Sequence, residues 1–409
     1  MSDMQSIRKI RAGIAGLKRG QWFIDYYESG EYSIKLESLL ASIERVSVEP
    51  RQGVELVAAF IETDSAVLGR ADDSNGSIGG VYRMDACDLF LHYATQCDDK
   101  AWLCDLLLHL YKHDEYGVRD SLIATSAHFL PEELLRKLVD EFWLMAGKAS
   151  SEYQKQHWLL GIEMVARQLK DARLFEKAQC ASSPQLPTAA CFNIAEVYFE
   201  SGEAGVALTW LEKVSPDETF MVDERDRLLL KIHRDQENID KAEETAWRIF
   251  RRYRHKETLS MLMGVVGEDK REQIVEMEAV EILSSSDLDC SDVDFLFEMK
   301  RIDDAEQYVR ERQEQLNGDY YPDLLTWAKQ FEADEKSLVT ILIYRALLDS
   351  ILRRRKSKNY HHGVRYLRKL DLLATQVNDW KELPDHQEYK SRLLDEHKRK
   401  VSFWGRYNK

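Results

Sequence analysis

The chain has 409 residues, of which 44 % are apolar and 32 % are charged, and its net charge at pH 7 is −15. Only 19 glycines and 7 prolines are present, which excludes collagen-like and low-complexity disordered chains. The acidic balance also argues against a protein that coats nucleic acid without specificity.

The start of the chain has no apolar core and no small-residue cleavage site, so it does not resemble an export signal. The sequence contains no run of 18 apolar residues, which a membrane-spanning helix would need. The six cysteines form no C-x-x-C pair, so we expect small core residues rather than a disulfide framework. We therefore expect a cytoplasmic protein without membrane contact.

The segment Asp72–Gly80 is the most loop-like part of the chain. It differs from a calcium-binding loop because Arg83 stands where such a loop needs a bidentate glutamate. We expect a turn supported by glycines before a helix at Val81–Tyr93. The backbone amides at that helix start form a weaker second candidate site, able to receive an anionic group.

Apolar residues recur at steps of three and four along most of the chain, as in 134–145, and no alternating strand pattern is found. Several helix starts are marked by proline and acidic residues, for example at Pro131 to Glu133. The sequence therefore predicts an all-α fold made of medium-length helices joined by short loops.

A helix–turn–helix pattern with a small residue on the second helix occurs at Ala207, Ala242 and Ala305. The steps between these alanines are 35 and 63 residues, the latter close to two units of about 32. This period is typical of tetratricopeptide-like hairpins, in which a small residue lets paired helices approach closely. We predict an α-solenoid of such hairpins, with an irregular helical bundle as the alternative.

Motifs of known catalytic sites are absent from the sequence. There is no H-E-x-x-H, no G-x-S-x-G and no glycine-rich phosphate or dinucleotide loop. His233-Arg234-Asp235 imitates a kinase triplet, but Asp240 stands where the metal-binding asparagine belongs. We expect a non-enzymatic protein with no catalytic residue, no metal and no cofactor.

The C-terminal region has the opposite charge to the rest of the chain. Residues 351–409 contain 16 Lys and Arg against 7 Asp and Glu, a net charge of +9, whereas residues 1–350 carry −24. A basic stripe and an apolar stripe (Tyr366, Leu370, Leu373 and Val377) share one predicted helix. The residues that could contact a partner or phosphate are Arg353, Arg354, Arg355, Lys358, His361, Arg365 and Arg368.

Two interpretations of this region stay open. The helix either caps the repeats with a solvated charged face or contacts phosphate or an acidic partner. The later run His397–Trp404 places basic residues beside two aromatic residues, which could stack on bases or fix the chain end to the body.

The segments Arg354–Leu367 and His397–Trp404 together resemble the end of a bacterial family of helical proteins of unknown function. Phe23–Tyr26 and Asp72–Gly76 are also similar to motifs of that family, and a similar ending occurs in proteins that carry a SWIM zinc finger upstream. The C-x-C…C-x-H pattern of that finger is absent here. The resemblance implies a bacterial, cytoplasmic, tetratricopeptide-like protein with no established activity.

We therefore expect three parts: an N-terminal helical region at 1–150, tetratricopeptide-like repeats at 151–350 and a basic C-terminal helical module at 351–409. The expected function is that of a scaffold or adaptor, which binds a partner protein through the concave surface of the repeats. The alternative is a nucleic-acid-associated factor that contacts phosphate through the basic C-terminal region.

Overall fold

The computed structural model describes residues 3–46, 48–183 and 185–408, and its regular structure within them is helical throughout. The one strand-like pairing in these segments is an isolated bridge between Ile24 and Ala71. The predicted all-α fold is thus confirmed. None of the helices in the described segments combines the length and the apolar content required to cross a lipid bilayer.

The chain divides into an N-terminal unit, Met1–Leu228, and a C-terminal unit, Leu229–Lys409, with the boundary inside helix α14 (Val222–Asp235). The three-part division at 150 and 350 stays a prediction.

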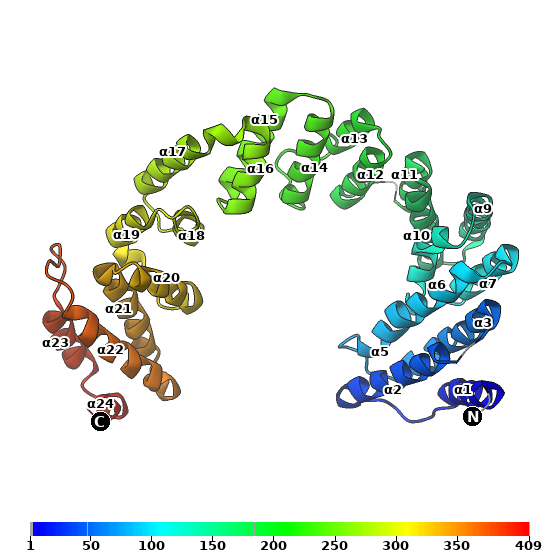
Figure 1. The fold of residues 1–409 in the computed structure, drawn as a ribbon, viewed down its shortest axis with the longest axis horizontal. Coiled ribbons are helices and arrows are strands. Elements are labelled where there is room, and N and C mark those ends of the chain that lie inside the picture. Colours follow the sequence, from blue (N-terminus) through cyan, green and yellow to red (C-terminus); the bar gives the residue numbers. More distant parts are fainter. Residues whose placement is uncertain (1–2, 47, 184, 409) are drawn as a thin grey trace. The chain divides into compact units, whose positions relative to one another are not determined.

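The N-terminal unit consists of helices joined by short connections (Figure 1). Its helices are α1 (Asp3–Lys18), α2 (Tyr26–Glu44), α3 (Pro50–Ile61), α4 (Asp64–Leu68), α5 (Ser77–Gly80), the π-helix η1 (Val81–Ala86), α6 (Cys87–Gln96), α7 (Lys100–Lys112), α8 (Asp120–Ala124), η2 (Ser126–His128), α9 (Glu132–Lys148), α10 (Glu152–Leu169), α11 (Ala172–Ser182), α12 (Thr188–Glu200) and α13 (Ala204–Leu211). One apolar core extends through α1 to α11.

A buried ion pair lies inside this core. The Arg119 guanidinium donates to the two carboxylate oxygens of Asp64 at 2.6 and 2.8 Å, and to the carbonyl of Leu110 at 2.7 Å. The two side chains are 3 % and 1 % exposed. The backbone N–H of Arg119 also donates to the Asp114 carboxylate at 2.9 Å. These bonds hold the starts of α4 and α8 against the end of α7.

The C-terminal unit continues with α15 (Ile239–Arg252), α16 (Lys256–Val266), η3 (Glu268–Lys270), α17 (Arg271–Ser284), α18 (Cys290–Glu298), α19 (Ile302–Glu311), η4 (Gln313–Gln315), α20 (Tyr321–Ala333), α21 (Ser337–Arg354), η5 (Ser357–Asn359), α22 (Tyr360–Ala374), α23 (His386–His397) and α24 (Val401–Tyr407). It has its own apolar core, which extends from Leu230 to Phe403. The predicted apolar stripe is partly wrong, because α22 ends at Ala374 and Val377 lies beyond the helix.

One turn geometry recurs after five helices, α10, α12, α14, α18 and α20. At each turn one residue is left-handed, and the next donates its N–H to a carbonyl five positions earlier at 2.7–2.9 Å. This pattern is a Schellman motif. The left-handed residues are Lys170, Gly202, Glu237, Lys300 and Glu335, at steps of 32, 35, 63 and 35 residues. Ala207, Ala242 and Ala305 are buried on the helices that follow three of these turns, as predicted.

Replacing Lys300 by glycine is expected to stabilise the C-terminal unit by about 0.5–1 kcal/mol, because glycine adopts a left-handed conformation without steric cost. Lys300 is exposed with a φ of 59°, and no described carboxylate forms an ion pair with it. Chemical unfolding of the two proteins measures this effect. Lys329→Gly, an exposed position inside α20, is the control and should destabilise by a similar amount. Destabilisation by Lys300→Gly would contradict the expectation.

An open depression of about 350 Å³ in the N-terminal unit is lined by residues of α8, α10 and α11, including Asp120, His157 and Glu163. Burial raises the pKa of Glu163 to about 7, although Gln179 donates a hydrogen bond to its carboxylate at 2.9 Å. The folded state therefore binds more protons than the unfolded state between the ordinary carboxyl pKa and pH 7, so stability falls as pH rises through this window.

Glu163→Gln is expected to remove this part of the pH dependence. Between pH 5 and pH 8 the unchanged protein should lose stability relative to the variant. Because the carboxyl is only partly buried, we expect this relative loss in the free energy of unfolding to be on the order of 1–2 kcal/mol. Urea unfolding over that range checks the prediction, with the exposed Glu152→Gln as control. A difference that does not change with pH would contradict it.

Candidate anion-binding site in the C-terminal unit

The end of the chain folds against α22. Phe403, on α24, is fully buried and packs edge-to-face on Tyr360 with ring centroids 5.8 Å apart. A Cβ placed at Gly363 would lie 3.2 Å from both the Phe403 ring and Leu348, so glycine permits this close approach. The Trp404 indole N–H donates to the carbonyl of His397 at 3.0 Å. The two aromatic residues of the terminal run therefore fix the chain end.

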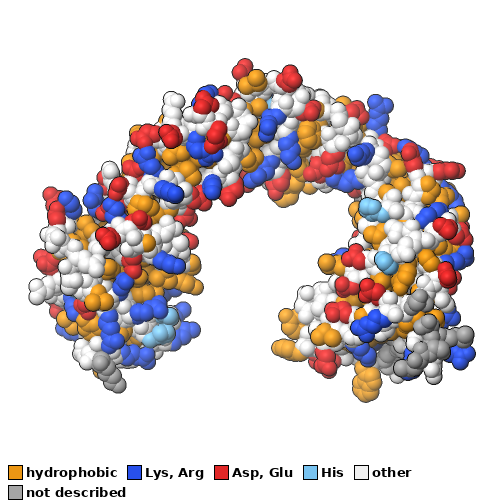
Figure 2. Space-filling model, viewed as in Figure 1, with side chains coloured by type: hydrophobic (Ala, Val, Ile, Leu, Met, Phe, Trp, Pro, Cys, Tyr) orange, Lys and Arg blue, Asp and Glu red, His pale blue; other side chains and the backbone are white. Residues whose placement is uncertain are grey.

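The structure divides the seven predicted contact residues into two groups. Two are held by other parts of the unit: Arg354 forms an ion pair with Asp319 at 2.6 Å, and Arg368 donates to the carbonyls of Arg406 and Tyr407, both at 3.3 Å. The other five have exposed side chains that form no ion pair with a described carboxylate, and they are Arg353, Arg355, Lys358, His361 and Arg365. Lys and Arg side chains gather over this end of the unit (Figure 2).

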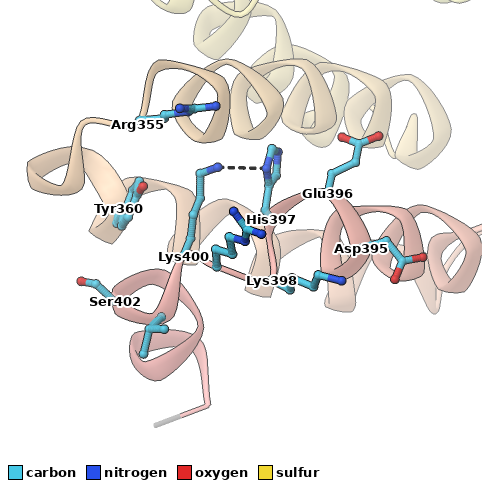
Figure 3. Close-up of a pocket in the computed structure, with 10 residues that line it drawn as sticks. Arg355, Tyr360, Asp395, Glu396, His397, Lys398, Lys400 and Ser402 are labelled. Carbon is cyan, nitrogen blue, oxygen red and sulfur yellow. Dashed lines mark hydrogen bonds between the residues drawn. The ribbon is translucent and has the colours of Figure 1, made fainter.

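A hollow of about 730 Å³ opens between the end of α21, the start of α22 and the connection from α23 to α24. We call it the basic hollow. It is lined by Arg355, Tyr360 and residues 395–402 (Figure 3). Arg355 has a left-handed backbone, with a φ of 56°, which ends α21.

The basic hollow brings like charges together. Lys400 Nζ lies 2.9 Å from His397 Nδ1, as the dashed line in Figure 3 shows. The pKa of Lys400 is lowered by burial and by the charge of Arg355, and the pKa of His397 is lowered by burial and by Lys400. In the described part of the chain, no carboxylate lies within 4 Å of the charged groups of Arg355 or Lys400. An anionic group bound here would relieve their repulsion.

Carboxylates also lie in the basic hollow. Asp395 and Glu396 line it from the end of α23, whereas Arg355 and Lys400 lie on its other side (Figure 3). This mixed lining suits a discrete anionic group more than a continuous polyanion.

Most of the basic hollow lies outside the residues predicted from sequence. Of the seven predicted residues only Arg355 lines it, and His397, Lys398, Arg399, Lys400 and Ser402 come from the terminal run. The sequence signal for these residues was their position beside two aromatic residues. Burial of Phe403 brings that run to the end of α21, and this contact cannot be read from a local pattern.

In the Asp72–Gly80 loop, the backbone amides proposed as an anion site are bonded by side chains of the loop itself. The Asp73 carboxylate accepts hydrogen bonds from the backbone N–H groups of Ile78 and Gly79 at 2.8 and 2.7 Å. Asp72 accepts a further bond from the N–H of Ser74 at 3.2 Å. The amides expected to receive an external anion are therefore occupied by the loop itself, and the helix begins at Ser77 rather than at Val81.

Comparison with known families gives a match to the model described as "Family of unknown function (DUF6880)", at residues 2–183 and 160–406. No curated protein and no solved structure matches the chain. The expected similarity to a family of unknown function is thus found. The bacterial origin and the similarity to proteins with SWIM zinc fingers stay predictions.

Proposed function

Because the chain belongs to the DUF6880 family, whose function is unknown, we propose a function from its own residues. We propose that it is a non-enzymatic cytoplasmic adaptor, built on tetratricopeptide-like hairpins, whose basic hollow binds an acidic segment of a partner protein. The role of the concave face of the repeats as a further contact stays a prediction.

The recurrent turn supports the repeat part of the proposal. Five Schellman turns at steps of 32, 35, 63 and 35 residues, with buried alanines after three of them, agree with a hairpin period of about 34 residues. Proteins built from such hairpins present extended surfaces to partner segments.

The observation that carries the binding part is the cluster of Arg355, His397 and Lys400. His397 Nδ1 holds the Lys400 ammonium in place, and keeping the charges of Lys400 and Arg355 close together without a bound counter-charge costs free energy, which a bound carboxylate or phosphate would recover. A peptide with separated carboxylates can place one of them beside Lys400 while avoiding Asp395 and Glu396. A nucleic-acid strand has a phosphate at each nucleotide, so it is repelled more strongly by these two residues.

Fluorescence anisotropy with the full chain tests this function. The probes are a labelled Glu-rich peptide, in which Ser and Gly separate the Glu residues, and a labelled single-stranded oligonucleotide, each titrated at low and high salt. We expect the peptide to bind, and the double variant Arg355→Glu with Lys400→Glu to weaken its binding at least tenfold. The matched control is Lys270→Glu with Lys329→Glu, which makes the same charge change at exposed positions outside the basic hollow.

Two outcomes would contradict the proposal. Equal peptide binding by the unchanged protein and the Arg355/Lys400 variant would place the contact elsewhere. Tighter binding of the oligonucleotide than of the peptide, lost in the same variant and at high salt, would favour the nucleic-acid alternative.

A further inference from the structure

A second depression of about 330 Å³ lies in the C-terminal unit, on residues of α20, α21 and α22. We call it the α20–α22 groove. Its apolar and aromatic lining includes Leu325, Leu347, Ile351 and Tyr366, and Tyr321 is the exposed aromatic residue beside them. This volume is in the lower range of ligand pockets and suits one aromatic side chain.

The polar side chains that α21 contributes to the groove are both held by Asp319. Ser350 Oγ donates to Asp319 Oδ1 at 2.5 Å, and Arg354 Nη2 lies 2.6 Å from Asp319 Oδ2. A polar ring edge buried against α21 would have to compete with Asp319 for these side chains, which costs free energy. This side of the groove therefore favours an apolar ring over a nucleobase.

The other side of the groove is cationic. Arg365 lies over the Tyr366 ring, 5.4 Å from its centroid, and its Nη2 atom is 3.5 Å from His362 Nδ1, which is too long for a strong hydrogen bond. The pKa of His362 is lowered by burial and by the charges of His361 and Arg365. Among the described residues, no carboxylate forms an ion pair with Arg365, so its charge is available to an anionic ligand.

The groove and the basic hollow share one connector. Arg354 and Asn359 line the groove, whereas their chain neighbours Arg355 and Tyr360 line the basic hollow. The two sites therefore border the same short segment, Arg354 to Tyr360, of the chain.

We propose that the α20–α22 groove receives an aromatic side chain of the acidic partner segment, while Arg365 binds a carboxylate next to it. The inference rests on the proposed function and adds the chemistry of the partner: an acidic peptide with an aromatic anchor. Aromatic anchors in small pockets often dominate the affinity of such contacts.

The test uses the full chain and two labelled peptides whose Glu residues are separated by Ser and Gly, identical except for a central Phe in one and Ala in the other. We expect the Phe peptide to bind at least tenfold more tightly, because burial of the ring adds to charge attraction. Tyr321→Ala and Arg365→Glu should each reduce this preference to threefold or less. Tyr320→Ala is the matched control, since Tyr320 and Tyr321 are 60 % and 59 % exposed and only Tyr321 lines the groove.

The outcomes separate the two proposals. Equal binding of the two peptides, or a preference that both groove variants retain, would overturn the inference and leave the proposed function standing. Binding of neither peptide would overturn both. If a single-stranded oligonucleotide binds instead and Tyr321→Ala weakens it, the groove holds a nucleobase and the inference is wrong.

Discussion

Replacing Asp64 by alanine is expected to lower the free energy of unfolding of the N-terminal unit by about 3–5 kcal/mol. The substitution leaves the Arg119 guanidinium in the core without its counter-ion, and that side chain is only 3 % exposed. A buried charge without a partner is among the costliest defects that one substitution can create. Urea unfolding measures the loss of stability, and hydrogen exchange of the amides in α4, α7 and α8 shows where it occurs.

Two further variants show whether loss of the counter-ion causes the destabilisation. Replacing both partners, with Asp64→Leu and Arg119→Met, should recover most of the lost stability, because no charge is then buried. Removing one partner of an exposed pair, with Glu132→Ala opposite Arg136, should change stability by less than about 0.5 kcal/mol. An effect of Asp64→Ala as small as that of Glu132→Ala would refute the account of this core.

Phe403→Ala is expected to destabilise the C-terminal unit by about 3–5 kcal/mol and to detach α24 from α22. The ring is fully buried against Tyr360 and Gly363, so its removal leaves a cavity at the contact that positions the terminal run. Because that run lines the basic hollow, binding of the Glu-rich peptide should weaken together with stability.

Hydrogen exchange in the α24 amides checks this result, with Val401→Ala on the same helix as control. Val401 is 76 % exposed, so its truncation should leave exchange nearly unchanged. Unchanged α24 exchange in Phe403→Ala would show that Phe403 does not fix the chain end.

The helical class and the paired helices were predictable from sequence, because burial imposes a regular spacing on apolar residues. Ala207, Ala242 and Ala305 marked their helices correctly. The recurrent turns were harder to find, since four of the five left-handed positions hold Lys or Glu instead of glycine. Hydrogen bonds across the turn and packing of the paired helices stabilise a conformation that these residues rarely adopt alone.

The candidate site was only partly predictable. Charge counting located the basic region, but it did not distinguish Arg368, which binds the carbonyls at the end of α24, from Arg355, which lines the basic hollow. That difference depends on contacts between residues almost 40 positions apart. The same reason explains why Lys400 was not among the predicted residues.

The titration of His397, followed by NMR with labelled histidine, tests the central claim most directly. Burial and the charge of Lys400 hold the pKa of His397 below its usual value in the free protein. A carboxylate bound beside Lys400 would favour protonated His397, so saturating Glu-rich peptide should raise this pKa. A titration curve of His397 that does not move when the peptide is bound would contradict binding in the basic hollow.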